Sequence, residues 1–216
     1  MREPSVTGLP TPVPHDPLPT VIAWLAEMTA LGTRRNPNAL ALATADASGR
    51  PSVRMVLVKE IAPSGYLVFY TNYGSRKAAE LDRASRAAGV LYWEELGRQV
   101  RFEGRVVRSP DAESDAYFAS RPERSQLNAW ASRQSQPLVD TAELERRAEQ
   151  KARELRGAPV PRPPNWGGYR LWFEALELWA EGADRFHERL RYTRELAPDD
   201  AFSFGAGQWS WRRLQP

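Results

Sequence analysis

The stretch FYTNYGSRKAAEL, residues 69–81, changes character halfway along its length. FYTN has the composition of a strand end, whereas SRKAAEL is rich in helix formers, so a strand-to-helix turn is predicted between them. Gly74, Ser75, Arg76 and Lys77 occupy this turn. A helix N-terminus presents unpaired N–H groups and the positive end of the helix dipole, so these residues predict an anion site, most commonly for phosphate. An ordinary capped helix with solvated basic side chains is the alternative.

The strand-like segments on both sides of this turn come in hairpins. GVLYWEE (89–95) and RQVRFEGRVVRS (98–109) are separated by the tight turn Leu96-Gly97, and ALALATAD (39–46) leads through DASG into PSVRMVLVKE (51–60). Helices are inserted among the strands without alternating with them, so we expect a mainly β (α+β) fold, an antiparallel barrel with helical insertions. Further strands are predicted at 66–72, 169–182, 185–194 and 209–216, and helices at 16–31, 75–84, 110–136 (with a break at Arg121-Pro122) and 141–157.

Composition limits the classes of function. Residues 1–15 are rich in proline and without periodicity, so we expect a flexible arm followed by a single domain over residues 16–216. The chain has no cysteine and no apolar run of membrane-spanning length, which favours a cytoplasmic protein. With two histidines and no cysteine, no metal site is expected. Basic residues are interspersed with acidic ones, so neither nucleic acid nor a membrane is an expected partner.

Two groups of polar side chains could bind a phosphorylated ligand. Arg54 and Lys59 are five residues apart on one predicted strand, so their side chains should lie on opposite faces and could serve two different groups, or simply flank an apolar strand. Tyr117, Arg121 and Ser125 are spaced four and four, which places them along one helical face. A phenol, a guanidinium and a small hydroxyl suit a phosphomonoester, and a helix-capping cluster is the alternative.

The segment RFHERLR presents a third candidate group. On a strand, Arg185, His187 and Arg189 would face the same way, and three such cations repel one another unless an anion or a planar ring lies against them. Trp179 is of a residue type that more often packs in a core than contacts a ligand. Gln99, Gln134 and Ser135 indicate little by themselves.

Several blocks of the chain together resemble the pyridoxine (pyridoxamine) 5′-phosphate oxidases, FMN enzymes with the split-barrel fold. The resemblance covers about Ala39 to Pro216, in family order and at family-like spacing. It implies an FMN-binding split β-barrel for the single domain. The blocks are RMVLVK (54–59), FYTNYGSRK (69–77), YFASRPERSQ (117–126), ASRQSQ (131–136), PNWGGYR (164–170) and RFHERLRYTR (185–194).

The resemblance also implies roles for individual residues. Lys59, Tyr117, Arg121 and Ser125 match the group that holds the substrate's 5′-phosphate. Arg185 and His187 match the catalytic pair that lies over and beside the pyridine ring of the substrate. The implied FMN contacts are Arg54, Met55, Val56, Leu57, Tyr70, Thr71, Ser75, Arg76, Lys77, Gln99, Gln134, Ser135, Trp179 and Arg189.

The implied reaction is oxidation of pyridoxamine or pyridoxine 5′-phosphate at C4′ to pyridoxal 5′-phosphate, with hydride transfer to flavin N5 and reoxidation by O2 to give H2O2. The implied assembly is a homodimer with FMN at the interface, contacted by both subunits. Two departures from the family pattern border the substrate. First, the arm contains Arg2 but not the family's Arg-x-x-Tyr element. Second, the chain has Trp179-Ala180-Glu181-Gly182 where the family commonly has Trp-Gln-Gly, and Phe186 where it usually has leucine.

Three other functions are compatible with parts of the sequence. A flavin oxidase of a phenazine-type pathway would share the HERLRY and RRLQP regions, but its aromatic carboxylate substrate carries no phosphate. A non-catalytic split-barrel protein that binds flavin or haem would not need a second phosphate site. Retention of Lys59, Tyr117, Arg121 and Ser125 together favours the vitamin B6 enzyme over both, and nucleic acid binding has no recognition motif to support it.

Overall fold

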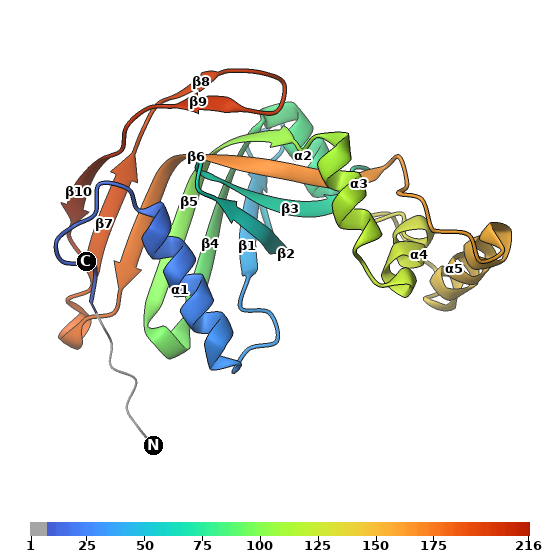
Figure 1. Ribbon diagram of the computed structural model, residues 1–216, viewed down its shortest axis with the longest axis horizontal. Helices are drawn as coiled ribbons and strands as arrows, with labels where there is room; N and C mark the ends of the chain where they lie inside the picture. The colour runs from blue at the N-terminus through green and yellow to red at the C-terminus, as the bar shows by residue number, and fades with distance from the viewer. Residues whose placement is uncertain (1–7) are drawn as a thin grey trace.

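The long strand β6 (Trp166–Ala180) organises the fold because it pairs with three other strands (Figure 1). In the computed structural model, which describes residues 8–216, one edge of β6 pairs with β5 (Arg98–Arg108) along most of its length. The other edge pairs first with β3 (Tyr66–Asn72) and then with β7 (Glu188–Thr193). β6 therefore belongs both to a barrel and to a sheet that extends beyond it.

The barrel closes through six strands. From β3 the order continues through β2 (Pro51–Ala62), β1 (Ala39–Ala45) and β4 (Arg86–Trp93) to β5, which returns to β6. All of these pairings are antiparallel, so the predicted antiparallel barrel is confirmed. Outside the barrel, β7 pairs with β10 (Ser210–Leu214), and β8 (Leu196–Pro198) and β9 (Phe204–Ala206) form a separate hairpin.

Side-chain alternation explains why these segments close into a barrel. Alternate residues of β1 and of most of β5 are buried, which is the period of a strand with one face on a core. Burying one large apolar side chain contributes about 1.5–3 kcal/mol, so the sum over the barrel is large. Helix α1 (Leu18–Leu31) covers this core with Leu18, Val21, Trp24 and Met28. The barrel side chains in the same core include Leu42, Phe69, Leu91, Phe102 and Phe173.

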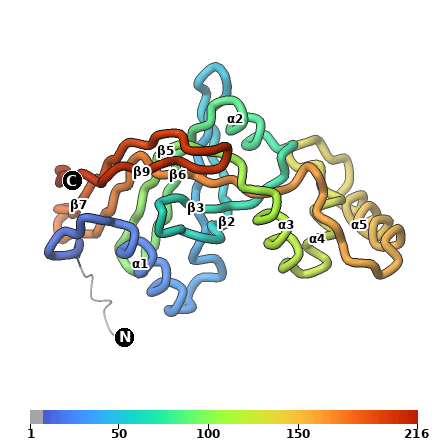
Figure 2. Tube along the Cα trace, turned by 45° about the horizontal axis from the view of Figure 1, so that its top comes forward, coloured from blue at the N-terminus to red at the C-terminus, as the bar shows by residue number. Residues whose placement is uncertain are grey.

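Helices α3 (Asp111–Ala119), α4 (Glu123–Ala131) and α5 (Ala142–Leu155) lie together on one side of the barrel, and β7 lies on the opposite side (Figures 1 and 2). A second, smaller core joins these helices to the barrel through Phe118, Ala129, Val160 and Trp166. Short helix α2 (Arg76–Ala84) follows β3 directly, as the strand-to-helix turn predicts. The short helical turn η1 (Glu94–Leu96) joins β4 to β5.

The prediction of a flexible arm over residues 1–15 lies partly outside the described residues, since residues 1–7 are not described. Within the described part, Leu9 is buried in the barrel core. The Tyr192 hydroxyl donates a hydrogen bond to the carbonyl of Pro14 at 3.2 Å. Residues 8–15 therefore follow the surface of the domain beside β7.

One predicted element is wrong in part. The strand predicted at 185–194 begins only at Glu188, because the chain first forms the short helical turn η2 (Ala183–Arg185). Asp184 and Arg185 have φ angles of 52° and 66°, which no β-strand adopts. Arg185 and His187 therefore do not share a strand face with Arg189.

No helix within residues 8–216 is both long enough and apolar enough to span a membrane.

Candidate active site

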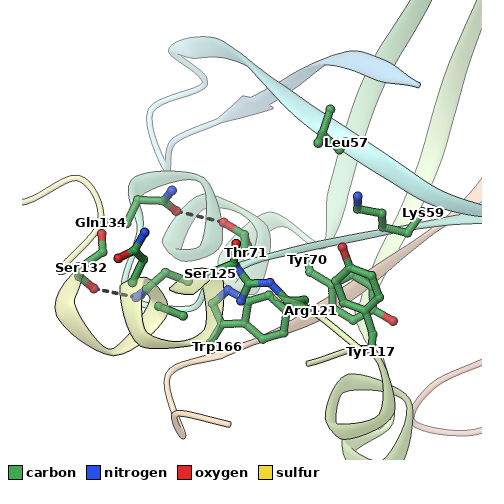
Figure 3. Close-up of a pocket in the computed structure, with 13 residues that line it drawn as sticks. Leu57, Lys59, Tyr70, Thr71, Tyr117, Arg121, Ser125, Ser132, Gln134 and Trp166 are labelled. Atoms are coloured by element: carbon green, nitrogen blue, oxygen red, sulfur yellow. Dashed lines mark hydrogen bonds between the residues drawn. The ribbon is translucent and has the colours of Figure 1, made fainter. Parts of the chain in front are cut away.

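A cavity of about 370 Å3 opens between the barrel and the helical insertion (Figure 3); we call it cavity A. β2 supplies Lys59, α3 supplies Tyr117, and α4 supplies Ser125. Arg121 comes from the turn between α3 and α4. The structure thus brings the four predicted phosphate-binding residues to one cavity. Its other lining residues are Leu57, Tyr70, Thr71, Asn72, Asn128, Ala129, Ser132, Gln134 and Trp166.

Arg121 is the cation of cavity A whose hydrogen bonding is incomplete. Its Nη1 is buried and has no hydrogen-bond partner among the described residues. The guanidinium lies over the rings of Trp166 and Phe118, 4.6 and 5.4 Å from their centroids. Burial lowers the pKa of Arg121, so the environment disfavours a charge that no carboxylate in residues 8–216 balances. An anionic ligand in cavity A would provide the missing acceptor.

The turn that carries Arg121 is fixed by Gln126, a buried residue of α4. Its Nε2 donates to the carbonyls of Phe118, Ala119 and Arg121 at 3.0, 3.2 and 3.0 Å. Phe118 and Ala119 are the last residues of α3, where helix geometry leaves carbonyls short of donors, although the Phe118 carbonyl also accepts from the N–H of Arg121 at 3.2 Å. Gln126 therefore satisfies the helix end and sets the direction in which Arg121 leaves it.

Aromatic rings form one wall of cavity A. The Tyr70 ring stacks on Tyr117, with centroids 4.0 Å apart, and on Trp166, with centroids 5.4 Å apart. Burial, together with the nearby carboxylate of Glu113, raises the pKa of Tyr70. Lys59 Nζ lies 5.6 Å from the centroid of the Tyr117 ring, on the opposite side of the cavity mouth from Arg121 (Figure 3). With its pKa raised, the Tyr70 hydroxyl stays protonated, and it donates to Glu113 Oε1 at 3.4 Å.

A second cavity of about 400 Å3, cavity B, lies at the N-terminus of α2. Gln134 lines both cavities, so the two are neighbours. Its other lining residues are Ser52, Val53, Arg54, Met55, Arg76, Lys77 and Ser135.

Lys77 is the buried cation of cavity B. Its Nζ donates to Gln134 Oε1 at 2.9 Å, to Thr71 Oγ1 at 3.1 Å and to Ser75 Oγ at 3.3 Å. No carboxylate in the described part of the chain pairs with it. Burial, and then the charge of Arg54, lower the pKa of Lys77 to about 8. A bound dianion would restore the ammonium form.

The N-terminus of α2 opens toward the same cavity. Ser75 caps the helix by accepting from the N–H of Ala78 at 3.4 Å, and the N–H of Arg76 donates to Ser135 Oγ at 3.2 Å. Ser135 has a φ of 71°, so the chain turns sharply there. The predicted anion site at the strand-to-helix turn thus has its cations, its hydroxyls and its helix end in one place.

Strand β2 separates its predicted contacts by face, as the offset of five indicates. Arg54 points to the side of Ser52, whereas Val53, Met55 and Leu57 point outward with Lys59. Val53 and Met55 are 70% and 60% exposed, a row of apolar side chains facing solvent in the single chain. Val56 is different, because its side chain belongs to the barrel core and cannot reach either cavity.

The remaining predicted residues form a separate group at the end of β6, the β6-end group. Gln99 pairs with Trp179, which pairs with Arg189, so the three lie in one row across β5, β6 and β7. The His187 ring packs against Trp179 with ring centroids 4.7 Å apart and the planes tilted by 41°, and its Nδ1 accepts from the N–H of Gly182 at 3.3 Å. Arg185 lies in the turn η2 before them.

The β6-end group lines neither cavity. Figure 1 shows β7 on the far side of the barrel from α3 and α4, which flank cavity A. A single chain therefore does not bring Arg185 and His187 to Arg121.

Comparison with known proteins covers most of the described residues. Residues 28–152 match the family described as pyridoxamine 5′-phosphate oxidase, and residues 166–216 match the region described as pyridoxine 5′-phosphate oxidase C-terminal dimerisation region. The chain belongs to the pyridoxamine 5′-phosphate oxidase family. The predicted resemblance is thus confirmed over both halves of the chain.

Two kinds of relative place the chain within this family. It is 49% identical over 201 residues to a pyridoxine/pyridoxamine 5′-phosphate oxidase of Rubrobacter xylanophilus, covering 93% of this chain and 87% of the relative. It is 46% identical to one from Cereibacter sphaeroides, covering 93% and 95%. Among solved structures, PhzG from Burkholderia lata, in complex with tetrahydrophenazine-1-carboxylic acid, is 36% identical with a TM-score of 0.83, covering 95% of both chains.

Membership of the pyridoxamine 5′-phosphate oxidase family identifies the chain as an FMN-binding oxidase and confirms the predicted cofactor. An FMN-binding protein of Nostoc punctiforme shares the fold with a TM-score of 0.70 at 18% identity. The donors of cavity B fit a phosphorylated cofactor, because Lys77 and the N-terminus of α2 face one space without a carboxylate partner for the lysine. The β6-end group, apart from Gln99, lies in the region matched as a dimerisation region.

Sequence reasoning missed several residues of the site. Trp166 belongs to the PNWGGYR block, but the sequence assigned it no role in the site; in the structure its ring lies against the guanidinium of Arg121. Asn72 accepts from the N–H of Gly74 at 2.8 Å and donates to the carbonyl of Ser132 at 3.2 Å, which ties the strand-to-helix turn to the segment after α4. An asparagine followed two residues later by glycine is typical of an Asx turn, and this pattern could have identified Asn72 from the sequence. Gln126 gives no such signal, since its partners lie in the preceding helix.

Proposed function

We propose that this chain oxidises pyridoxamine 5′-phosphate or pyridoxine 5′-phosphate to pyridoxal 5′-phosphate, as a cytoplasmic enzyme of vitamin B6 metabolism. The observation that carries the proposal is the unpaired, buried Nη1 of Arg121 in a cavity that adjoins a separate cation-lined cavity at a helix N-terminus. Two neighbouring anion sites suit two phosphorylated molecules, a cofactor and a substrate. The absence of cysteine is in keeping with a cytoplasmic location.

In this proposal cavity B binds the phosphate of FMN. Lys77, Arg54 and Arg76 supply the positive charge, and the N–H groups that begin α2 supply further donors. Gln134, between the cavities, and the outward side chains of Met55 and Leu57 then border the flavin ring. When bound, FMN supplies the redox chemistry, by taking a hydride from C4′ of the substrate at N5 and passing the electrons to O2, which leaves as H2O2.

Cavity A binds the 5′-phosphate of the substrate. Arg121 donates through its free Nη1, Lys59 adds a second cation from the opposite side, and the hydroxyls of Tyr117 and Ser125 donate from α3 and α4. The rigid aromatic wall of Tyr70, Tyr117 and Trp166 and the cap made by Gln126 hold these donors in place before the substrate arrives. The protein thus contributes by orientation, which converts an encounter into a fixed geometry.

The proposal requires a homodimer in which the partner subunit supplies the β6-end group. Three observations support it: the group lies away from both cavities of its own chain, it falls mostly within the matched dimerisation region, and the apolar row of Val53 and Met55 on β2 is exposed beside cavity B. In the dimer, Arg185 and His187 of one protomer approach the substrate ring held by the other. Two equivalent sites follow from two-fold symmetry.

A second function is favoured by one specific observation, the 36% identity and 0.83 TM-score with PhzG bound to tetrahydrophenazine-1-carboxylic acid. A reduced aromatic carboxylate would need one or two hydrogen-bond donors for its carboxylate, but not a phosphate site with four donors. Lys59, Tyr117, Arg121 and Ser125 surround one cavity here, so we place the phosphorylated substrate first.

Steady-state oxidation assays test the choice. Purified protein with FMN should release H2O2 with pyridoxine 5′-phosphate and pyridoxamine 5′-phosphate, and not with the unphosphorylated vitamers at equal concentration. Faster turnover of a dihydrophenazine carboxylate than of either phosphate would assign the chain to the second function. Absence of peroxide with all of these substrates would remove both.

A further inference from the structure

Glu80, on helix α2, is a buried carboxylate behind cavity B. It accepts hydrogen bonds from residues of three different elements. The donors are the hydroxyl of Thr44 on β1, the hydroxyl of Ser52 on β2 at 2.7 Å, Arg54 Nη2 on β2 at 3.3 Å and Arg76 Nε on α2 at 2.8 Å.

The two guanidinium groups line cavity B, whereas Glu80 does not. Glu80 therefore cannot contact a molecule in the cavity and acts only through the arginines. Arg76 is largely exposed, and its bond to Glu80 is the one side-chain hydrogen bond that holds it within the described part of the chain. Arg54 also donates to Thr44 Oγ1 at 2.5 Å and to the carbonyl of Leu42 at 3.2 Å, so loss of the carboxylate would release Arg76 above all. The two guanidinium groups would then face the same space without the charge that separates them.

Glu80 also sets the charge of the cavity. Burial raises its pKa, but the hydrogen bonds from Thr44, Ser52 and Arg76 outweigh burial and lower the pKa to about 2, so the carboxylate is ionised at any physiological pH. The three cations Arg54, Arg76 and Lys77 together with the single carboxylate leave a net charge of +2. A phosphomonoester carries about −1.5 to −2 near pH 7, so the cavity and a phosphate dianion balance.

We propose that Glu80 is a positioning residue that fixes Arg54 and Arg76 for a phosphate dianion and thereby makes the chain prefer FMN to riboflavin. The inference rests on the placement of the FMN phosphate in cavity B given under the proposed function. It does not depend on the identity of the substrate. Glu80 adds no contact of its own to the flavin, so its effect should fall on the phosphorylated form alone.

Flavin binding by the full-length protein, freed of flavin, tests this role. Dissociation constants for FMN and for riboflavin are measured by quenching of flavin fluorescence in the unsubstituted protein and in Glu80→Gln, which keeps the side-chain size. We expect Glu80→Gln to weaken FMN binding about tenfold and to leave riboflavin binding unchanged, because the amide places an N–H₂ group against a guanidinium. Glu80→Asp should recover part of the preference, since it restores the charge.

Asp82→Asn is the matched control. Asp82 lies on the same helix and pairs with Arg108 and Tyr169, so its loss also removes a carboxylate–arginine pair but touches neither Arg54 nor Arg76. This variant should keep the full preference for FMN. If Glu80→Gln does not fold, Thr44→Val replaces it, since it keeps the carboxylate and removes the hydroxyl that bonds both Glu80 and Arg54.

Equal weakening of FMN and riboflavin binding in Glu80→Gln would overturn the proposal, because it would show a purely structural role. An unchanged FMN constant in a folded Glu80→Gln, or in the substituting Thr44→Val, would overturn it as well. If the unsubstituted protein binds both flavins equally, the phosphate does not occupy cavity B and the proposal fails with that placement. A protein that prefers FMN in the expected way but does not oxidise a B6 phosphate would contradict only the proposed substrate.

Discussion

The guanidinium of Arg121 lies 4.6 Å above the ring of Trp166, with one buried nitrogen left without a partner. The aromatic face stabilises the cation without neutralising it, because a ring quadrupole offers no acceptor lone pair to the free N–H. Arg121 is thus held in place while its capacity to bind an anion is retained. This pairing underlies the first of the predictions below.

Arg121→Ala should raise the KM for pyridoxine 5′-phosphate about 10- to 100-fold, since a charged hydrogen bond contributes about 1.5–3 kcal/mol. The kcat should change little, because Arg121 binds the phosphate, which is remote from the reacting carbon. Steady-state kinetics would check it. Arg124→Ala is the control, because Arg124 is an exposed cation on α4 that lines neither cavity. An unchanged KM in Arg121→Ala would remove Arg121 from the phosphate site.

Arg185→Ala should lower kcat, because this residue is placed against the reacting ring. In a homodimer its loss should also be rescued in mixtures with Arg121→Ala. A heterodimer of the two variants contains one site with both substitutions and one site with neither, so random exchange should restore about a quarter of the original sites. Activity is measured at substrate concentrations far below the KM of Arg121→Ala, after the two variants are mixed under conditions that allow subunit exchange. No gain over the separate variants, despite demonstrated exchange, would contradict a site shared between subunits.

FMN binding should weaken as the pH rises through about 8. Burial and the charge of Arg54 lower the pKa of Lys77 to about 8 in the free protein. Above this pH the side chain is mostly neutral and no longer attracts the phosphate as a cation. A bound phosphate raises this pKa, and binding at higher pH must therefore take up a proton. Dissociation constants measured across this range check the slope. Lys77→Arg should flatten the dependence, and an equal slope in that variant would assign the titration to another group.

Gln126→Ala should reduce the free energy of unfolding by about 1–3 kcal/mol, because it removes the side-chain donor to the carbonyls of Phe118, Ala119 and Arg121. It should also raise the KM for the phosphorylated substrate, since the direction of Arg121 depends on the same bonds. Denaturant titration and kinetics measure the two effects. Gln150→Ala on α5, whose amide bonds Glu154 at the exposed surface, should change neither quantity appreciably. A stable Gln126→Ala protein with normal KM would show that the turn is held by other contacts.

Local patterns were sufficient to predict much of the site. Strand alternation in β2 placed Arg54 and Lys59 on opposite faces, and the composition of residues 69–81 located the helix N-terminus beside Lys77. Both depend only on neighbours in sequence, so the sequence contains all of the necessary information.

Other features depend on contacts that no local pattern records. Asp184 and Arg185 have left-handed backbone although neither is glycine, and nothing in the sequence indicates this turn. The strand predicted from residue 185 therefore begins too early, since β7 starts at Glu188. Glu80 has no distinguishing signal in the sequence, because its burial depends on contacts with β1 and β2 from earlier in the chain. The hairpin of β8 and β9 was missed because each strand has only three residues.

The double pairing of β6 also governs the order in which the molecule can be assembled. During synthesis β3 and β5 are complete long before residue 166 emerges, and each then presents an open edge of unpaired N–H and C=O groups. The barrel cannot close until β6 has left the ribosome. Nascent chains that stall before that point should be prone to edge-to-edge association, and they should depend on chaperones more than the finished protein does.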